Sequence, residues 1–263
     1  RIPKAFDNNK DVIDNLFDYA NAVVQVKLPE WFYIAWVACR LVPANKVDPA
    51  DLPPNTTPDC RPVNIGNAER RLITRSYFDE GLQNTYNSIL EPVQNGVGIS
   101  GGISITAFGV QAVMDANRQF AVFQGDIKNG YNEVGRASVL DAMRETDGKL
   151  NNTLAFTHAI LEPSAYVGMG NGTNLIEAPF KVCEGSQQGA IESGWLFSLA
   201  ANKSFQRLND TLAETGGGVM AIIDDHYCMG PPEDIFAALP QFKADLAEAG
   251  LTLQDNKSQC YID

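Results

Sequence analysis

Apolar residues recur every three or four positions in several long segments, and this spacing predicts helices. The longest of these segments cover residues 8–43, 132–144, 191–214 and 233–249. Pro240 lies inside the last segment, so we expect that helix to be kinked or divided. Gly250 follows where a helix commonly ends. Residues 150–180 read as loop and strand-like sequence with few landmarks.

Short apolar runs that end in turn residues predict strands. Residues 120–123 lead to Asp126, and residues 219–223 lead directly to Asp224 and Asp225, which we place at the tip of a hairpin. The closing stretch, LTLQDNKSQCYI, predicts a further hairpin. Strands interleaved with helices, without a Gly-x-Gly-x-x-Gly after the first strand, favour an α+β fold with an antiparallel sheet over a Rossmann-type fold.

Two segments are rich in residues that break regular structure. Residues 43–60 are rich in Pro, Asp and Asn and are expected to form a loop. The glycine-rich stretch QNGVGISGGIS, which begins at Gln94, lacks the Lys-Ser/Thr ending of a phosphate-binding P-loop. We therefore expect a flexible turn before a helix there.

The composition is that of an ordinary globular protein, with 44% hydrophobic and 20% charged residues among 263. This length allows one large domain or two modest ones. The longest apolar run, WFYIAWVAC, ends at Arg40 and is too short to cross a bilayer, so we expect a buried helix and no membrane contact. Because the chain starts at Arg1 rather than Met, we expect it to be a piece of a longer polypeptide.

The five cysteines form no C-x-x-C pair and fit neither a disulfide framework nor a zinc site. They suggest a reducing compartment, so we expect an intracellular protein of the nucleus or the cytoplasm.

The net charge of −12 argues against a nucleic-acid partner, because phosphate binding normally requires a basic surface. One segment departs from this balance. Between residues 61 and 75 the only acid is Glu69, against four arginines, Arg61, Arg70, Arg71 and Arg75. A solvated helix face explains this basic segment as well as a binding role does.

Three acids, Asp126, Asp224 and Asp225, follow apolar strand-like runs. Taken singly, Asp126 could cap the following helix, and the Asp-Asp pair could be a plain turn. Consecutive side chains on a strand face opposite sides, whereas at a turn both can point outward. Three converging carboxylates repel one another unless cations neutralise them. Two Mg²⁺ or Mn²⁺ ions about 3.5–4 Å apart are the usual arrangement for phosphoryl transfer.

Several segments, in order, resemble the fingers and palm of reverse transcriptases, especially those of non-LTR retrotransposons and group II intron-like retroelements. These segments are RPVNIGNAERRLITR, EPVQNGVGISGG, FQGDIKNGYNEVGR, GSQQGAIESGWLFSLA, AIIDDHYCMG and AGLTLQDNKSQCYI. The resemblance covers about residues 61–263, and residues 1–60 have no counterpart. It implies a right-hand polymerase palm, with an antiparallel sheet packed on helices, plus partial fingers.

The resemblance also implies a division of the chain. Residues 1–60 would form an N-terminal helical extension or part of the fingers, and residues 61–125 the fingers and the start of the palm. Residues 126–263 would form the palm with its metal site, and no thumb would follow in this chain.

In this family Asp126, Asp224 and Asp225 would hold two metal ions, with the backbone carbonyl of Ile127 assisting. Tyr131 would pack under the incoming sugar, where a ring collides with a 2′-hydroxyl and favours deoxynucleotides. The alternative for Tyr131 is an ordinary core aromatic.

The remaining implied roles concern the nucleotide and the template. Gln188 and Gly189 would lie against the nascent base pair, where glycine permits close backbone approach. Arg61 and one of Arg70 or Arg71 would bind the triphosphate, since guanidinium matches phosphate oxygens. Lys257 would donate a proton to the departing pyrophosphate, or it is a solvated turn lysine. His158 and His226 are expected to be structural or exposed.

The sequence departs from the family at two places. Gly189 is followed by Ala190-Ile191-Glu192 rather than Asp-Pro, and Ile222 stands where many members carry an aromatic. The resemblance implies an RNA-directed DNA polymerase that takes dNTPs and an RNA or DNA template-primer, with further domains attached. The alternative is a catalytically silent scaffold or protein-binding domain derived from such a palm, which the net charge and the altered segment favour.

Overall fold

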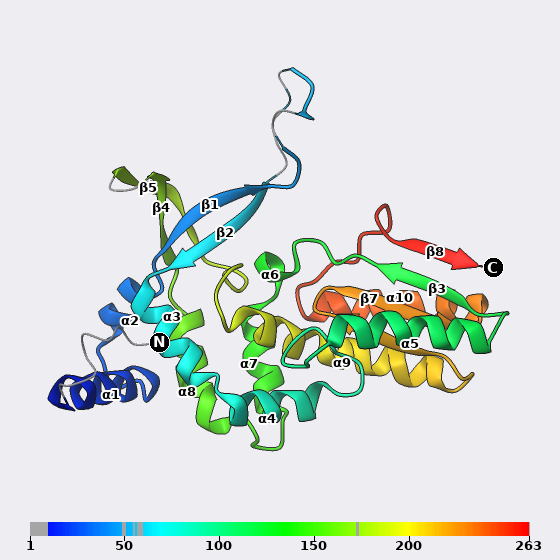
Figure 1. The fold of residues 1–263 in the computed structure, drawn as a ribbon, viewed down its shortest axis with the longest axis horizontal. Coiled ribbons are helices and arrows are strands. Elements are labelled where there is room, and N and C mark those ends of the chain that lie inside the picture. Colours follow the sequence, from blue (N-terminus) through cyan, green and yellow to red (C-terminus); the bar gives the residue numbers. More distant parts are fainter. Residues whose placement is uncertain (1–9, 49–50, 55, 57–59, 172–173, 263) are drawn as a thin grey trace.

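The computed structural model describes residues 10–48, 51–54, 56, 60–171 and 174–262, which form helices and two four-stranded sheets (Figure 1). The helices are α1 (Lys10–Val24), α2 (Glu30–Trp36), α3 (Ala68–Tyr77), α4 (Glu80–Leu90), α5 (Gly102–Ala116), α6 (Gly130–Glu133), α7 (Arg136–Arg144), α8 (Asn151–Leu161), α9 (Ser193–Ala213) and α10 (Pro232–Glu248). The strands are β1 (Cys39–Asn45), β2 (Cys60–Gly66), β3 (Ala121–Gly125), β4 (Ala165–Asn171), β5 (Asn174–Val182), β6 (Gly218–Ile222), β7 (Asp225–Gly230) and β8 (Gln259–Ile262). The predicted α+β class with antiparallel sheets is confirmed.

The first sheet has the strand order β6-β7-β3-β8 and is antiparallel throughout. Helices α9 and α10 cover one face, where Phe205 and Phe242 pack on the ring of His226. Helix α5 lies on the other face, so close to β6 that a Cβ on Gly109 would lie 2.5 Å from the Met220 Cε. The strand residues on the face toward α9 and α10, such as Phe123, Val219 and Cys228, belong to the main core.

The second sheet has the order β2-β1-β4-β5, in which β1 and β4 form its single parallel pair. It has a small core of its own around Cys39, Val167 and Ala178. Figure 1 shows this sheet with α1 to α3 at one end of the molecule and the first sheet with α5, α9 and α10 at the other. The segment between residues 126 and 263 thus supplies strands to both sheets.

Several predicted elements differ in detail from the structure. The helical pattern over residues 8–43 divides into α1 and α2, and the chain is already a strand from Cys39, because β1 pairs with β2. Within the loop expected over residues 43–60, residues 43–45 belong to β1 and Cys60 begins β2. Residues 49–50, 55 and 57–59 of this loop lie outside the described part of the chain. A helix, α8, precedes the strands in the region 150–180. Helix α10 runs unbroken through Pro240, so of the two predicted outcomes, a kink or a division, the division does not occur.

The hairpin predicted for the C-terminal stretch is wrong. Strand β8 pairs with β3, with Cys260 opposite Phe123, while Leu253 forms a bridge with Ile127. The two halves of this stretch therefore pair with β3 and its continuation instead of with each other. This arrangement brings the turn that carries Lys257 beside Asp126.

The buried helix predicted around Trp31 is α2, which buries Tyr33 and Trp36 but leaves Trp31 exposed. Within the described part of the chain, no helix combines the length and the apolar character needed to cross a membrane.

Candidate metal and nucleotide site

The three predicted carboxylates meet at the end of the first sheet. Asp224 and Asp225 lie at the turn between β6 and β7, and Ile222 pairs with Asp225 across it. On the neighbouring strand Gly125 pairs with His226, so the next residue, Asp126, lies beside Asp225. All three acids line one cavity of about 430 Å³.

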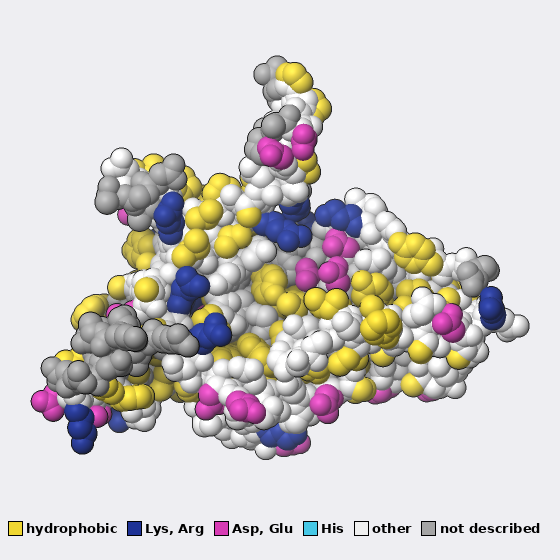
Figure 2. Space-filling view, viewed as in Figure 1, with side chains coloured by type: hydrophobic (Ala, Val, Ile, Leu, Met, Phe, Trp, Pro, Cys, Tyr) yellow, Lys and Arg dark blue, Asp and Glu magenta, His cyan; other side chains and the backbone are white. Residues whose placement is uncertain are grey.

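Basic side chains line the same cavity. Lys46 and Arg61 reach it from the β1–β2 hairpin, and Lys257 from the turn before β8. Figure 2 shows acidic side chains gathered in a hollow of the surface with Lys and Arg side chains at its edge. The Lys257 Nζ lies 3.9 Å from the Asp126 Oδ2. The cavity therefore offers negative charge on its floor and positive charge on its walls.

The pKa values of Asp224 and Asp225 are raised above the ordinary value for aspartate. Burial raises the pKa of Asp224, the negative charges of Asp225 and Asp126 raise it further, and Arg61 opposes the effect. Burial and Asp126 likewise raise the pKa of Asp225, again against Arg61. Two of the three carboxylates are thus less favourable as anions than exposed aspartates, which is the condition that a nearby cation relieves.

Carboxylate oxygens are the ligands that Mg²⁺ and Mn²⁺ prefer, so the donor set fits such an ion in kind. Among the described residues, however, no group of three or more His, Cys, Asp or Glu side chains is already arranged to hold a metal. A bound ion would have to draw the three carboxylates closer together and compete with Lys257 for Asp126.

Tyr131 and Ile127 line the cavity beside the acids. The ring of Tyr131 packs on Phe197, with the centroids 5.7 Å apart. Burial, with a contribution from Asp224, raises the pKa of Tyr131 to about 12, so its hydroxyl group is neutral at ordinary pH. Tyr131 thus belongs both to the rim of the core and to the wall of the cavity.

Gln188 lines the cavity as well, within the loop that joins β5 to α9. Its backbone carbonyl accepts a hydrogen bond from the Asn64 amide of β2 at 2.7 Å. The next residue, Gly189, has φ +105°, and a Cβ there would lie 2.7 Å from the Asn64 oxygen. Glycine is therefore needed for close approach to strand β2.

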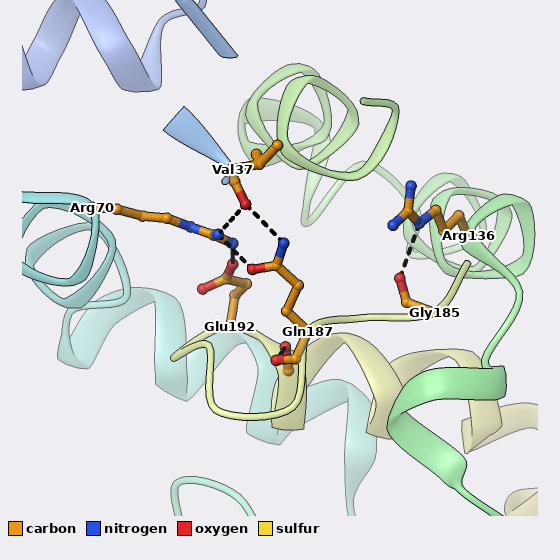
Figure 3. A network of polar contacts seen from close by, with 7 residues as sticks. Val37, Arg70, Arg136, Gly185, Gln187 and Glu192 are labelled. Atoms are coloured by element: carbon orange, nitrogen blue, oxygen red, sulfur yellow. Dashed lines mark hydrogen bonds and ion pairs between the residues drawn. The ribbon is translucent and has the colours of Figure 1, made fainter. Parts of the chain in front are cut away.

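Arg70, Arg71 and Gly189 do not line this cavity, but lie together at a separate small crevice. The guanidinium group of Arg70 is buried and pairs with the Glu192 carboxylate, with 2.7 Å between Nη2 and Oε1 (Figure 3). Its Nη1 also donates to the Gln187 Oε1 at 2.6 Å. Of the three candidate triphosphate ligands, Arg61 is the one that the structure places at the cavity.

Sequence reasoning missed the residues that hold the site's loops in place. Gln187 and Glu192 bind Arg70, and Arg136 donates its Nε hydrogen to the Gly185 carbonyl at 2.9 Å (Figure 3). Gln94 is buried beside the Asp-Asp turn. The departure from the family at Glu192 was a signal, because a carboxylate introduced beside an apolar helix start requires a partner.

No protein-family model matches the sequence, and no curated protein matches it. Solved telomerase structures do match the fold. Apo telomerase from Candida tropicalis superimposes with a TM-score of 0.60 and 11% identity, over 96% of this chain and 50% of that one. Apo telomerase from Candida tropicalis truncated from the C-terminal domain superimposes with a TM-score of 0.56 and 10% identity, over 86% of this chain and 50% of that one.

Telomerase from Candida albicans, in complex with a TWJ fragment of telomeric RNA, gives a TM-score of 0.59 and 11% identity, over 89% of this chain and 43% of that one. The chain thus spans about half the length of these structures. At such low identity the likeness shows a shared fold alone.

Proposed function

We propose that this chain carries the nucleotidyl-transfer site of a template-directed polymerase that copies RNA into DNA with divalent cations. The observation that carries the proposal is the cavity in which Asp126, Asp224 and Asp225 face Arg61 and Lys257. The telomerase-like fold supports the general class of reaction. The order of the sequence motifs supports the finer assignment to reverse transcriptases of the non-LTR or group II type.

The three carboxylates are the residues that would hold two Mg²⁺ or Mn²⁺ ions, which supply charge neutralisation and Lewis acidity in phosphoryl transfer. Arg61 is placed to bind the triphosphate, because its planar guanidinium group can bond two phosphate oxygens at once. The ammonium group of Lys257 lines the cavity and is proposed to donate a proton to the leaving pyrophosphate.

The choice of deoxynucleotides is assigned to Tyr131. Its ring is fixed against Phe197 and is neutral, so it acts by its shape and not by its charge. We propose that a nucleotide bound at the acids places its sugar near this ring, which would collide with a 2′-hydroxyl. Gln188 lies in the same cavity and is proposed to contact the nascent base pair.

The partners proposed are a template-primer of RNA or DNA, dNTPs and further domains of a longer polypeptide. The net charge of −12 means that most of the affinity for the duplex has to come from those further domains. The chain's coverage of about half the telomerase structures is consistent with such domains.

The second candidate function is a catalytically silent scaffold or protein-binding domain. Two observations favour it. Glu192, in the segment that departs from the family, is committed to a buried ion pair with Arg70. The net charge of −12 also favours it, because a nucleic-acid partner normally requires a basic surface.

A primer-extension assay separates the two functions. The full-length gene product is given a primed RNA template, Mg²⁺ or Mn²⁺, and either dNTPs or rNTPs. We expect incorporation of dNTPs, and a loss of more than about a hundredfold in Asp224→Asn, since even residues that only support metal ligands cost roughly 10–100-fold. The control is Asp210→Asn, at an exposed position of α9, which should retain full activity.

Equal incorporation by wild type and Asp224→Asn would refute the proposed site. Incorporation by neither protein would favour the scaffold. Preferential use of rNTPs would contradict the role of Tyr131.

A further inference from the structure

The turn that carries the acidic pair has a backbone conformation that its sequence does not favour. Ile222 pairs with Asp225, so Ile223 and Asp224 form a two-residue hairpin loop. Such loops need a positive φ at their first residue, where glycine or asparagine is usual. Ile223 stands there instead, with φ +61°. A β-branched side chain in this region is strained, and its surroundings must hold it there.

A single side chain binds both backbone polar groups of Ile223. The Gln94 Oε1 accepts a hydrogen bond from the Ile223 amide at 2.7 Å, and the Gln94 Nε2 donates to the Ile223 carbonyl at 3.2 Å. The Oε1 also accepts from the Gly96 amide at 2.9 Å. Gln94 is only 3% exposed, so water does not compete for these bonds.

The segment around Gln94 is held directly against strand β6. The Ala221 amide donates to the Val93 carbonyl at 2.9 Å, and the Asn95 amide donates to the Ala221 carbonyl at 2.7 Å. Gly96 allows this approach, because a Cβ there would lie 2.5 Å from the Ile223 nitrogen. The start of the glycine-rich stretch is thus fitted to the Asp-Asp turn.

We propose that Gln94 is a positioning residue for the acidic pair. By holding Ile223 in the left-handed region, its amide group sets the direction in which Asp224 and Asp225 leave the turn. An amide is required, because it offers one acceptor and one donor to the same residue, whereas a glutamate would offer acceptors only. We call the two hydrogen bonds from Gln94 to the Ile223 backbone the Gln94 clamp. The effect of this clamp on catalysis rests on the proposed function, whereas its effect on the conformation of Ile223 does not.

The first test removes the hydrogen bonds from Gln94 to Ile223 and then replaces Ile223 by glycine, which adopts the same backbone conformation without them. Gln94→Met keeps the shape and loses the hydrogen bonds, and Gln94→Glu loses the donor. We expect either variant to reduce Mn²⁺ affinity and dNTP incorporation by roughly 10–100-fold, as for other residues that orient metal ligands. Adding Ile223→Gly to Gln94→Met should restore most of the loss, because glycine adopts positive φ without strain.

Two controls define the result. Ile223→Gly alone measures how much Mn²⁺ affinity is lost with the isoleucine side chain itself. The double-mutant cycle then gives the coupling between Gln94 and Ile223. Gln83→Met removes a side-chain bond to a backbone carbonyl far from the turn, that of Phe78, and should leave Mn²⁺ affinity unchanged. A merely destabilised core would not be rescued by Ile223→Gly, so failure of the rescue would overturn the proposal.

The second test does not depend on activity. Hydrogen exchange of the Ile223 amide should become faster in Gln94→Met, while the Ala221 amide, bonded to Val93, stays protected. Unchanged exchange at Ile223, or faster exchange with unchanged Mn²⁺ affinity, would overturn the positioning role. Faster exchange and weaker Mn²⁺ binding in a protein that never incorporates dNTPs would support the clamp and refute the polymerase.

Discussion

His226 follows the acidic pair directly and is completely buried between Phe205 and Phe242. Burial lowers its pKa to about 4. Its Nδ1 lies 3.2 Å from the Asp224 carbonyl oxygen, so the neutral ring carries its proton on Nδ1 and donates it to that oxygen. The expectation of a structural histidine thus agrees with its place behind the turn.

The folded protein should lose stability in acid because of His226. The unfolded chain binds a proton on this ring near pH 6.5, whereas the folded protein does so only near pH 4. As the pH falls from about 6.5 to 4, the unfolded state gains more protons, so the free energy of unfolding falls by at most about 1.4 kcal/mol per pH unit. Urea unfolding across this range measures the slope.

The matched variant is His226→Asn, which keeps a donor for the Asp224 carbonyl and cannot titrate. Its stability should depend less steeply on pH than that of the wild type over this window. Other titrating groups are common to both proteins and cancel in the comparison. Identical slopes would show that His226 is not buried as a neutral ring.

At the scale of elements, a buried ion pair fastens α3 to the segment that begins α9. The side chains of Arg70 and Glu192 are each about 5% exposed. The Gln187 side chain accepts a hydrogen bond from Arg70 and donates one to the Val37 carbonyl at the end of α2 (Figure 3). The Arg70 guanidinium also lies 5.9 Å from the centre of the Trp36 ring. The loop that carries Gln188 to the cavity is thus anchored by residues outside the cavity.

Removing one member of this ion pair should lower the free energy of unfolding more than replacing both members by apolar residues. Arg70→Met leaves the Glu192 carboxylate buried without a partner, which should lower the free energy of unfolding by roughly 3–5 kcal/mol. Adding Glu192→Leu should recover much of that loss, since a well-packed apolar pair has no charge to desolvate. Chemical denaturation of the single and double variants measures both changes.

Arg71→Met is the control, because Arg71 is the exposed neighbour of Arg70, and its effect should stay within about 0.5 kcal/mol. Strictly additive losses from Arg70→Met and Glu192→Leu would contradict a direct pairing.

At the scale of the whole molecule, divalent cations should stabilise the fold. Ions that bind the three converged carboxylates bind the folded chain and not the unfolded one, which separates these acids. At a cation concentration of a hundred times the dissociation constant, binding raises the free energy of unfolding by roughly 2.7 kcal/mol. This corresponds to a rise of about 5–10 °C in melting temperature for a chain of this size. Thermal unfolding with added Mg²⁺ or Mn²⁺, at constant ionic strength, measures the shift.

Asp224→Asn should lose most of this shift. Without added ions it should melt no lower than the wild type, because one of three repelling charges is gone. An equal shift in both proteins would place the ions elsewhere on this acidic surface.

The elements that were predicted well are those specified by neighbouring residues. Helices α7, α9 and α10 follow from helical periodicity, and the β6–β7 hairpin follows from an apolar run that ends in two acids. The hairpin predicted for the C-terminal stretch is wrong, because a turn flanked by strand-like residues does not reveal that both halves pair along the edge of β3 and its continuation. Strand partners depend on the register of the whole sheet.

By itself, the sequence determined the chemistry available to the site. Asp126 after one strand and Asp224-Asp225 in a turn are local features, as are the arginines and Tyr131. Only the tertiary structure decided which arginine reaches the cavity, because Arg70 is drawn into the interior by Glu192. It likewise decided that Gln94 lies against Ile223, far along the chain. Buried polar groups pair with whichever partner the packing brings within hydrogen-bond distance, and the spacing of residues along the sequence does not reveal that partner.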